Sequence, residues 1–328
     1  MAATEIFPAF SYACDMISAK LARGERVLLQ DVSFSLSSGE RMAIIGETGS
    51  GKTMLALSIL GLLPANVRMQ SGCIQMDGAA LPSGKQLQTL RGDKLVYIPQ
   101  NGAEFLLPAR TVRKQLYDSL KKLSLPRKAF PALAAEKLRL VGFDAPETIL
   151  DKYPFQLSGG MAQRVTIALA ACSRARLLIA DEPTNGLDEA GRAQFFALLD
   201  SIFPDAAKLI ITHDISVASR CDRVLVLCGG RMLETDASST VLRAPRHPYT
   251  KALLAAQVAN AMQPSPVLLR GRIRLSVLRP LLGGGCSLSE QRDAETCGRE
   301  HRMVVLPCLR SKTAARYLGT RRFCRMFP

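Results

Sequence analysis

The sequence predicts an α/β fold in which a mainly parallel sheet carries helices on both faces. The first indication is an apolar run at residues 41–45, which is followed by a glycine-rich loop and then by good helix formers from Met54. The second is that short apolar runs alternate with helical segments again after residue 158. Continuous apolar runs are typical of strands that are buried on both faces, so this alternation predicts parallel strands joined by crossover helices.

The first hundred residues predict an antiparallel edge that leads into this sheet. Residues 31–36 alternate between polar and apolar side chains, as in a half-buried strand, and residues 37–39 supply a turn. The run at 41–45 then predicts the buried strand that precedes the glycine-rich loop.

The loop itself fits the phosphate-binding pattern G-x-x-x-x-G-K-[ST] between a strand and a helix. Its glycines let successive N–H groups turn toward phosphate oxygens, and the helix that follows adds the positive end of its dipole. We expect Lys52 to reach the β- and γ-phosphates and the Thr53 hydroxyl to bind Mg²⁺. The predicted phosphate-binding residues are Gly46, Glu47, Thr48, Gly49, Ser50, Gly51, Lys52 and Thr53.

After a strand at 95–98, residues 101–157 are expected to be mainly helical, with helices near 112–123 and 132–141. The chain then returns to the sheet. We expect a helix from about Met161, a strand ending near residue 180, and a helix at 189–202. Strands at 209–212 and 223–227 complete the predicted sheet.

Two carboxylates end the apolar run at 177–180. Asp181 is placed to hold Mg²⁺, directly or through water, and Glu182 on the alternate face is placed to polarise an attacking water. Alone, this pair would fit two exposed acids that open a loop; the phosphate loop upstream favours an active site.

A second glycine-rich motif spans Leu157–Arg164. Ser158, Gly159 and Gly160 precede a run of helix formers, and a helix N-terminus with free N–H groups binds anions. A simple Gly-Gly turn would not account for this motif together with the others in the order in which they occur.

Taken together, these motifs resemble the ATP-binding subunits of ABC (ATP-binding cassette) transporters, from about residue 12 to residue 257. The resemblance implies a P-loop NTPase, ABC ATPase core that hydrolyses ATP with Mg²⁺. It implies that His213 contacts the γ-phosphate and that Gln100 senses Mg²⁺ and water and links the site to the membrane partner. The expected catalytic set is therefore Glu182, His213, Gln100 and Lys52, and the expected metal set is Thr53, Gln100 and Asp181.

The same resemblance implies partners. Residues 158–160 would close over ATP that is held by a second ABC ATPase, identical or related, and the loop 185–188 would cross to that subunit. A helical subdomain at about 101–157 would face two transmembrane permease subunits, which work with an extracellular substrate-binding protein. No specific nucleic acid is expected. Residues 1–260 would form the ATP-binding domain, and 261–328 a basic, poorly ordered extension.

Within the family, the stretch Arg246–Leu254, with its His-Pro-Tyr-Thr core, resembles the peptide/nickel importers. Tyr153–Phe155 and Leu62–Arg68 agree, and the combination favours nickel or metal–chelate members, with peptide transport close behind. An exporter ATPase is disfavoured by the His-Pro-Tyr-Thr stretch. A soluble ABC ATPase acting on ribosomes or nucleic acid is disfavoured because the chain has one cassette and no long coiled-coil insertion.

Composition adds limits to this interpretation. The net charge is +15, and residues 261–328 contribute 13 Lys or Arg against 4 Asp or Glu, which suits a solvated extension or contact with anionic lipid or nucleic acid. No apolar run approaches the roughly 20 residues of a bilayer span, and no basic-then-apolar start indicates a signal peptide. We therefore expect a peripheral protein on the cytoplasmic face of the membrane.

Nine cysteines in a cytosolic chain argue against a disulfide framework. Four cluster in the extension, with spacings wider than those of iron–sulfur ligands, so a diverged segment with free thiols is favoured over a metal cluster: Cys286, Cys297, Cys308 and Cys324. The stretch Ile17–Arg23, where many relatives stack an aromatic ring on adenine, has none, which predicts loose base selectivity.

Overall fold

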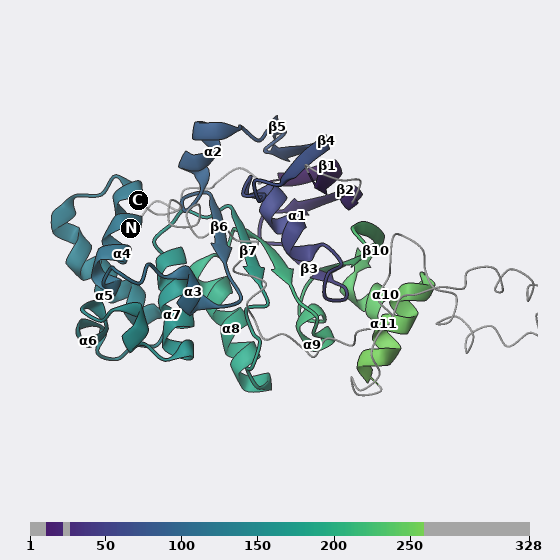
Figure 1. The fold of residues 1–328 in the computed structure, drawn as a ribbon. Helices are drawn as coiled ribbons and strands as arrows, with labels where there is room; N and C mark the ends of the chain where they lie inside the picture. Colours follow the sequence, from purple (N-terminus) through teal and green to yellow (C-terminus); the bar gives the residue numbers. More distant parts are fainter. Residues whose placement is uncertain (1–10, 22–26, 259–328) are drawn as a thin grey trace, which may run out of the picture.

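The computed structural model describes residues 11–21 and 27–258, which form a ten-stranded sheet in the order β5-β4-β1-β2-β10-β9-β3-β8-β7-β6. In Figure 1 the strands β1, β2, β4 and β5 lie above, helices α4 to α6 gather on one side of the parallel strands, and α10 and α11 lie on the other. The four cysteines between residues 286 and 324 and the rest of the basic extension lie outside the described residues.

The centre of the sheet is parallel, as predicted. Each of its five strands pairs with its neighbours in parallel register, and β9 also forms an antiparallel pair with β10 (Arg231–Ala237). The five strands are β3 (Arg41–Ile45), β6 (Leu95–Ile98), β7 (Leu177–Asp181), β8 (Ala207–Ile211) and β9 (Arg223–Cys228). Their near-continuous burial explains why they appear in the sequence as unbroken apolar runs.

The antiparallel edge is also confirmed, and it is larger than predicted. Its strands are β1 (Ser11–Leu21), β2 (Val27–Ser37), β4 (Val67–Met76) and β5 (Ala79–Ala80). It joins the parallel part through one parallel pairing, Arg231 with Gln30. The stretch that lacks an adenine-stacking aromatic begins inside β1, where Ile17 and Ala19 are fully buried, and Tyr12 lies in the same strand.

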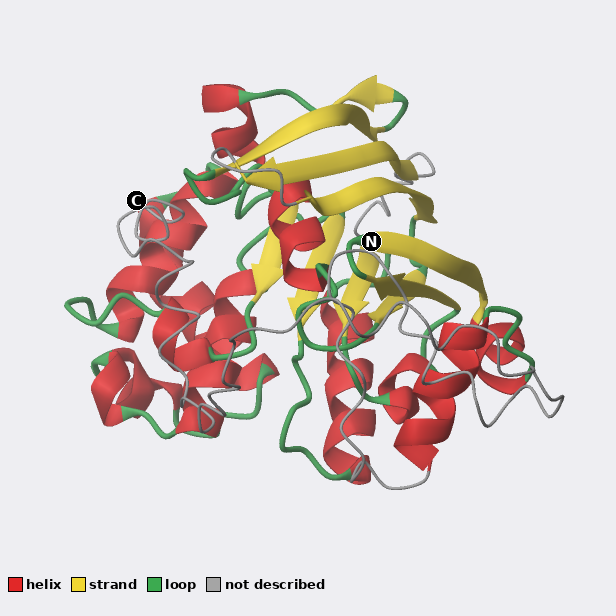
Figure 2. Ribbon diagram, turned by 45° about the vertical axis from the view of Figure 1, so that its right-hand side comes forward, coloured by secondary structure: helices red, strands yellow, loops and turns green. Residues whose placement is uncertain are grey.

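The helices of the segment after β6 are short. They are α3 (Gly102–Phe105), α4 (Val112–Leu120), α5 (Phe130–Leu140) and α6 (Pro146–Leu150), with single 3₁₀ turns at Lys121–Leu123, Arg127–Ala129 and Pro154–Gln156. The helices predicted at 112–123 and 132–141 correspond to α4 with its following turn and to α5. Figure 2 shows these helices beside the strands.

The other helices flank the sheet or lie at its edges. The phosphate loop leads into α1 (Lys52–Ile59), and the second glycine-rich motif opens α7, which begins at Gly159, two residues earlier than Met161. Helix α8 spans the predicted 189–202. The set is completed by α2 (Gly84–Leu90), α7 (Gly159–Ala170), α8 (Glu189–Ile202), α9 (Ile215–Ala218), α10 (Ser238–Arg243) and α11 (Pro248–Val258).

Two apolar cores lie on opposite faces of the parallel strands. In β3, Ala43 and Ile45 belong to the core shared with α4, α5 and α7, whereas Met42 and Ile44 belong to the core under α1 and the antiparallel strands. This alternation follows from the two-residue period of a strand. Within the described part of the chain, no helix is long and apolar enough to span a bilayer.

Candidate nucleotide site

The predicted site residues come together because the five central strands are parallel. Their carboxyl ends lie at one edge of the sheet, so the segments that follow them meet there: the phosphate loop after β3, Gln100 after β6, Asp181 and Glu182 at the end of β7, and His213 after β8. This edge is where ligands bind in open α/β sheets.

The phosphate loop depends on its glycines. Gly46, Gly49 and Gly51 have φ values of 154°, 84° and 106°, which side chains rarely adopt. A Cβ on Gly46 would lie 2.1 Å from the carbonyl oxygen of Leu227, so the loop packs directly on the end of β9. The Ser50 hydroxyl is buried and has no hydrogen-bond partner within the described chain, as expected of a loop that binds an anionic ligand.

Lys52 folds back over this loop. Its Nζ donates to the carbonyl oxygens of Gly46 at 2.7 Å and of Glu47 at 2.9 Å, and the side chain is largely buried. Burial lowers the pKa of Lys52, while the nearby Glu182, Asp181 and Glu47 carboxylates act to raise it. The Lys52 ammonium, held beside the loop, can neutralise charge on a bound phosphate.

Asp181 lies opposite, at the end of β7. Its Oδ2 accepts hydrogen bonds from the hydroxyls of Thr53 at 3.0 Å and Tyr97 at 3.1 Å. Burial raises the pKa of Asp181, and these two hydrogen bonds oppose that change. Burial, together with the neighbouring Asp181 carboxylate, raises the pKa of Tyr97 well above its ordinary value, so Tyr97 remains a hydrogen-bond donor to Asp181.

The oxygen pair formed by Thr53 and Asp181 fits a hard cation such as Mg²⁺. Within residues 11–21 and 27–258, no cluster of three His, Cys, Asp or Glu side chains could hold a metal alone. In Mg²⁺ sites generally, one or two protein oxygens combine with substrate phosphates and water.

Glu182 follows in a strained conformation. Its φ of 48° lies in the left-handed region, and its N–H donates to the Ile211 carbonyl at 2.8 Å. His213 Nδ1 lies 2.8 Å from Glu182 Oε1. The Glu182 carboxylate is therefore paired with the histidine that follows the neighbouring strand β8.

The structure does not bring the second glycine-rich motif to this phosphate loop. Ser158 is the N-cap of α7, with its Oγ accepting from the Met161 N–H at 3.3 Å, and Gly159 and Gly160 are exposed with open space around them. Gln100 is also exposed.

Two tyrosines at the site were not predicted. The sequence places Tyr97 only within a strand, and its contact with Asp181 follows from the pairing of β6 with β7. Tyr249 belongs to the His-Pro-Tyr-Thr stretch, and its hydroxyl accepts a hydrogen bond from the Glu47 N–H at 3.3 Å. That stretch marked the family branch in the sequence, but nothing in its local pattern indicates contact with the phosphate loop.

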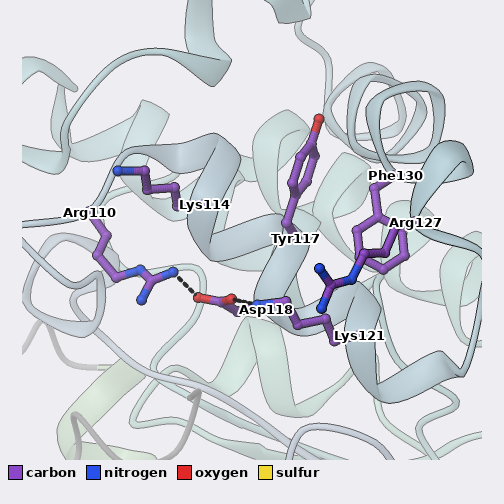
Figure 3. A pocket seen from close by; sticks show the side chains of 7 residues that line it. All are labelled: Arg110, Lys114, Tyr117, Asp118, Lys121, Arg127 and Phe130. Carbon is purple, nitrogen blue, oxygen red and sulfur yellow. Dashed lines mark hydrogen bonds and ion pairs between the residues drawn. The ribbon is translucent and has the colours of Figure 1, made fainter.

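A separate pocket of about 320 Å³ lies among α4, α5 and the turns between them (Figure 3). Its centre is the buried Asp118 carboxylate, which forms ion pairs with Arg110 and Lys121. The rings of Tyr117 and Phe130 form an edge-to-face pair, with centroids 5.6 Å apart. None of the predicted site residues lines this pocket.

A glycine-rich loop with its lysine beside a strand that ends in carboxylates is the arrangement of a phosphate-binding α/β protein. The sequence model of the family described as ABC transporter matches residues 29–185. The chain belongs to the ABC transporter family, as an ATP-binding subunit with ATPase activity, which confirms the resemblance seen in the sequence.

Several relatives share most of the described chain. The dipeptide transport ATP-binding protein DppD of Haemophilus influenzae is 36% identical over 270 residues, covering 79% of this chain and 79% of that protein. The metal-staphylopine import system ATP-binding protein CntD of Staphylococcus aureus is 36% identical, covering 70% and 87%. The chain spans about half, 47%, of the Escherichia coli protein YejF, an uncharacterized ABC transporter ATP-binding protein, at 39% identity.

Solved structures confirm the fold. CbiO1 from Clostridium perfringens, part of the ABC transporter complex cbiONQ, aligns with a TM-score of 0.61 at 25% identity. The alignment covers 77% of this chain and 95% of that protein. The predicted ABC ATPase core is therefore correct.

Proposed function

We propose that this chain energises a membrane importer by hydrolysing ATP at the edge formed by the phosphate loop, β7 and β8. The observation that carries the proposal is the Thr53–Asp181 hydrogen bond, which places the end of the phosphate loop against the end of the carboxylate strand. Backbone N–H groups of residues 46–53, the Ser50 hydroxyl and Lys52 would bind the phosphates.

In this proposal the side chains around the loop divide the chemistry between them. Thr53 and Asp181 would hold Mg²⁺, with Gln100 near it; the ion, when bound, neutralises phosphate charge. Glu182 would polarise the attacking water, and the 2.8 Å contact with His213 would orient the Glu182 carboxylate. Lys52 would stabilise charge that develops on the transferred phosphoryl group.

The exposed Ser158–Gly160 helix start supports a dimer in which each chain completes the other's site. Closure on ATP and reopening after hydrolysis would then move two permease subunits through the helices at 101–157, which we retain as a proposed subdomain. An extracellular binding protein would deliver cargo to the permeases. The whole assembly would hold this chain peripherally at the cytoplasmic face of the membrane.

For the cargo we propose a small peptide or a metal–chelate such as nickel bound to an organic ligand. The sequence likeness at Leu62–Arg68 favours the metal–chelate. The relatives named for dipeptide transport and for metal-staphylopine import support both a peptide and a metal–chelate cargo.

The test combines hydrolysis with uptake in cells that lack the gene. Glu182→Gln should keep ATP binding, because the phosphate loop is unchanged, but should lower hydrolysis by about 100-fold or more. It should also fail to restore uptake of labelled nickel with a chelator or of labelled di- and oligopeptides, whereas wild type restores one of them. Glu136→Gln, at an exposed glutamate on α5, is the matched control. Wild-type hydrolysis by Glu182→Gln would remove Glu182 from the proposed chemistry, and no uptake with wild type would refute the importer assignment.

A further inference from the structure

The peptide group between Gly46 and Glu47 is held from both sides. Its carbonyl oxygen, that of Gly46, accepts from Lys52 Nζ at 2.7 Å. Its N–H, that of Glu47, donates to the Tyr249 hydroxyl at 3.3 Å. Because a peptide group is planar, fixing its N–H also fixes the direction of its carbonyl. Tyr249 therefore acts on the carbonyl to which the Lys52 ammonium is bonded.

Tyr249 reaches the loop from the opposite end of the sequence. It lies in the first turn of α11, which packs beside α10 on the side of the sheet away from α4 to α6 (Figure 1). Its ring packs on the larger apolar core, and its hydroxyl lies near the Cys228 side chain at the end of β9. Burial raises the pKa of Tyr249, so its hydroxyl stays protonated.

The start of α11 is itself fixed to the sheet. The Glu234 carboxylate on β10 accepts hydrogen bonds from the backbone N–H of Arg246 at 2.8 Å and of His247 at 3.1 Å. His247 Nδ1 in turn accepts from the Tyr249 N–H at 3.1 Å. These bonds fix the backbone of residues 246–249 relative to Glu234 on β10. They therefore limit how far the Tyr249 side chain can move from the loop.

The Glu47 side chain lies near the same groups. Burial raises the pKa of Glu47, while a hydrogen bond from Tyr249 and the charge of Lys52 favour its ionised form. The phosphate loop, Lys52 and Tyr249 thus form one connected set, although the function derived above uses only the first two.

We propose that Tyr249 is a positioning residue for ATP binding: through the Gly46–Glu47 peptide it fixes the Lys52 ammonium at the mouth of the phosphate loop. This inference rests on the proposed function, because it assumes that the loop binds the nucleotide phosphates. It gives the His-Pro-Tyr-Thr stretch a physical role and couples helix α11 to the nucleotide site.

The test compares nucleotides with and without a β-phosphate on the purified full chain. Tyr249→Phe removes the hydroxyl and keeps the ring, so the fold should persist. By titration calorimetry, the Kd of ADP should rise about fivefold, the factor that one typical net hydrogen bond represents. The Kd of AMP, which lacks the β-phosphate that Lys52 reaches, should stay within about twofold, and Tm should change little.

Tyr117→Phe, at a tyrosine on α4 far along the chain from the loop, is the matched control. An ADP affinity unchanged in Tyr249→Phe, or equal losses for ADP and AMP accompanied by a lower Tm, would overturn the inference, since the second pattern indicates packing alone. Lys52→Ala distinguishes an error in the proposed phosphate site from an error in the role of Tyr249. If it leaves ADP binding intact, the proposed phosphate site is wrong; if it abolishes binding while Tyr249→Phe has no effect, only the role of Tyr249 is wrong.

Discussion

Asp181 is a carboxylate buried where its charge does not stabilise the folded chain. Burial raises the pKa of Asp181 above its ordinary value of 3.8, despite hydrogen bonds from Thr53 and Tyr97. A carboxyl group with a raised pKa binds its proton more tightly in the folded state than in the unfolded state. Asp181 therefore contributes to stability below its ordinary pKa of 3.8. This contribution is lost as the pH rises through the raised pKa that Asp181 has in the folded chain. At neutral pH this side chain is retained for chemistry at a cost in stability.

We therefore expect Asp181→Asn to stabilise the nucleotide-free chain at pH 7 and to raise its Tm, because the amide side chain has no charge to bury. The advantage should shrink toward pH 4, where Asp181 itself becomes protonated. The same variant should lose Mg²⁺-dependent ATP hydrolysis. Thermal unfolding between pH 4 and pH 8 measures the first effect, with the exposed Asp144→Asn as control. A lower Tm at pH 7 would show that the charge of Asp181 is needed for folding.

At this scale, the sequence predicts side chains whose roles depend on local spacing. Lys52 and Thr53 follow the glycines at fixed positions, and Asp181 ends an apolar strand, so all three could be placed before the structure was known. Tyr97 and Tyr249 could not, because their partners lie far away along the chain and meet them only after the sheet has formed. The structure shows where these side chains lie, but their roles in binding and catalysis, like those of Glu182, His213 and Gln100, remain predictions.

At the scale of elements, the segment that follows Gln100 is tied to α7. Gly102 donates its N–H to Gln163 Oε1 at 3.1 Å, and a Cβ at this position would lie 2.8 Å from the Gln163 Cα. The Thr166 hydroxyl also donates to the Gly102 carbonyl. Ser158 is the N-cap of α7, so these contacts join the segment after Gln100 to the helix that carries the Ser158 motif.

Gly102→Ala should push this segment away from α7. We expect a loss of about 1–3 kcal/mol in the free energy of unfolding, because the contact is with backbone that cannot easily move. ATPase activity should fall by more than the folded fraction explains. Urea unfolding and steady-state hydrolysis measure the two effects. Ala103→Ser, which adds one atom at the exposed neighbouring position, should change neither. Wild-type stability for Gly102→Ala would mean that α3 and α7 can separate freely.

The elements themselves were predicted with uneven success for a physical reason. Strands that are buried on both faces are continuous apolar runs, which the sequence alone predicts. Helix 189–202 is also predicted, and in the structure it begins after an Asp188 cap. The strands β4 and β10 are mostly half-buried or exposed. Their apolar pattern is too weak to predict these two strands from the sequence. They are identified only by their pairing with β1 and β9 in the structure.

For the whole molecule, the junction between the two parts of the sheet lies behind the phosphate loop. Gly230 donates to the Ser50 carbonyl at 2.8 Å and accepts from the Gln30 N–H at 2.8 Å. A Cβ on Gly230 would lie 2.3 Å from the Leu28 carbonyl, so the antiparallel edge approaches the loop as backbone against backbone. Such long-range approach leaves no periodic signal in a sequence.

The other whole-molecule feature is the exposed start of α7, which stands apart from the phosphate loop of its own chain. If each ATP is bound between the loop of one subunit and Ser158–Gly160 of the other, then defects in the two motifs must complement each other in a mixed dimer. Lys52→Ala removes the loop lysine, and Ser158→Arg places a bulky cation on the helix start while leaving the loop intact. Each variant alone would have no complete site.

Mixing the two variants in equal amounts should restore ATP hydrolysis to about one quarter of the wild-type rate. Half of the dimers would be mixed, and each mixed dimer would have one complete site, if a symmetric pair of independent sites is formed. The rate should rise with total chain concentration, and sedimentation should show dimers in ATP. Recovery would establish that the site is shared between two copies of this chain. Dimers without recovery would mean that the Ser158 motif serves its own loop, and no dimers would show that the proper partner is a related ATPase of different sequence.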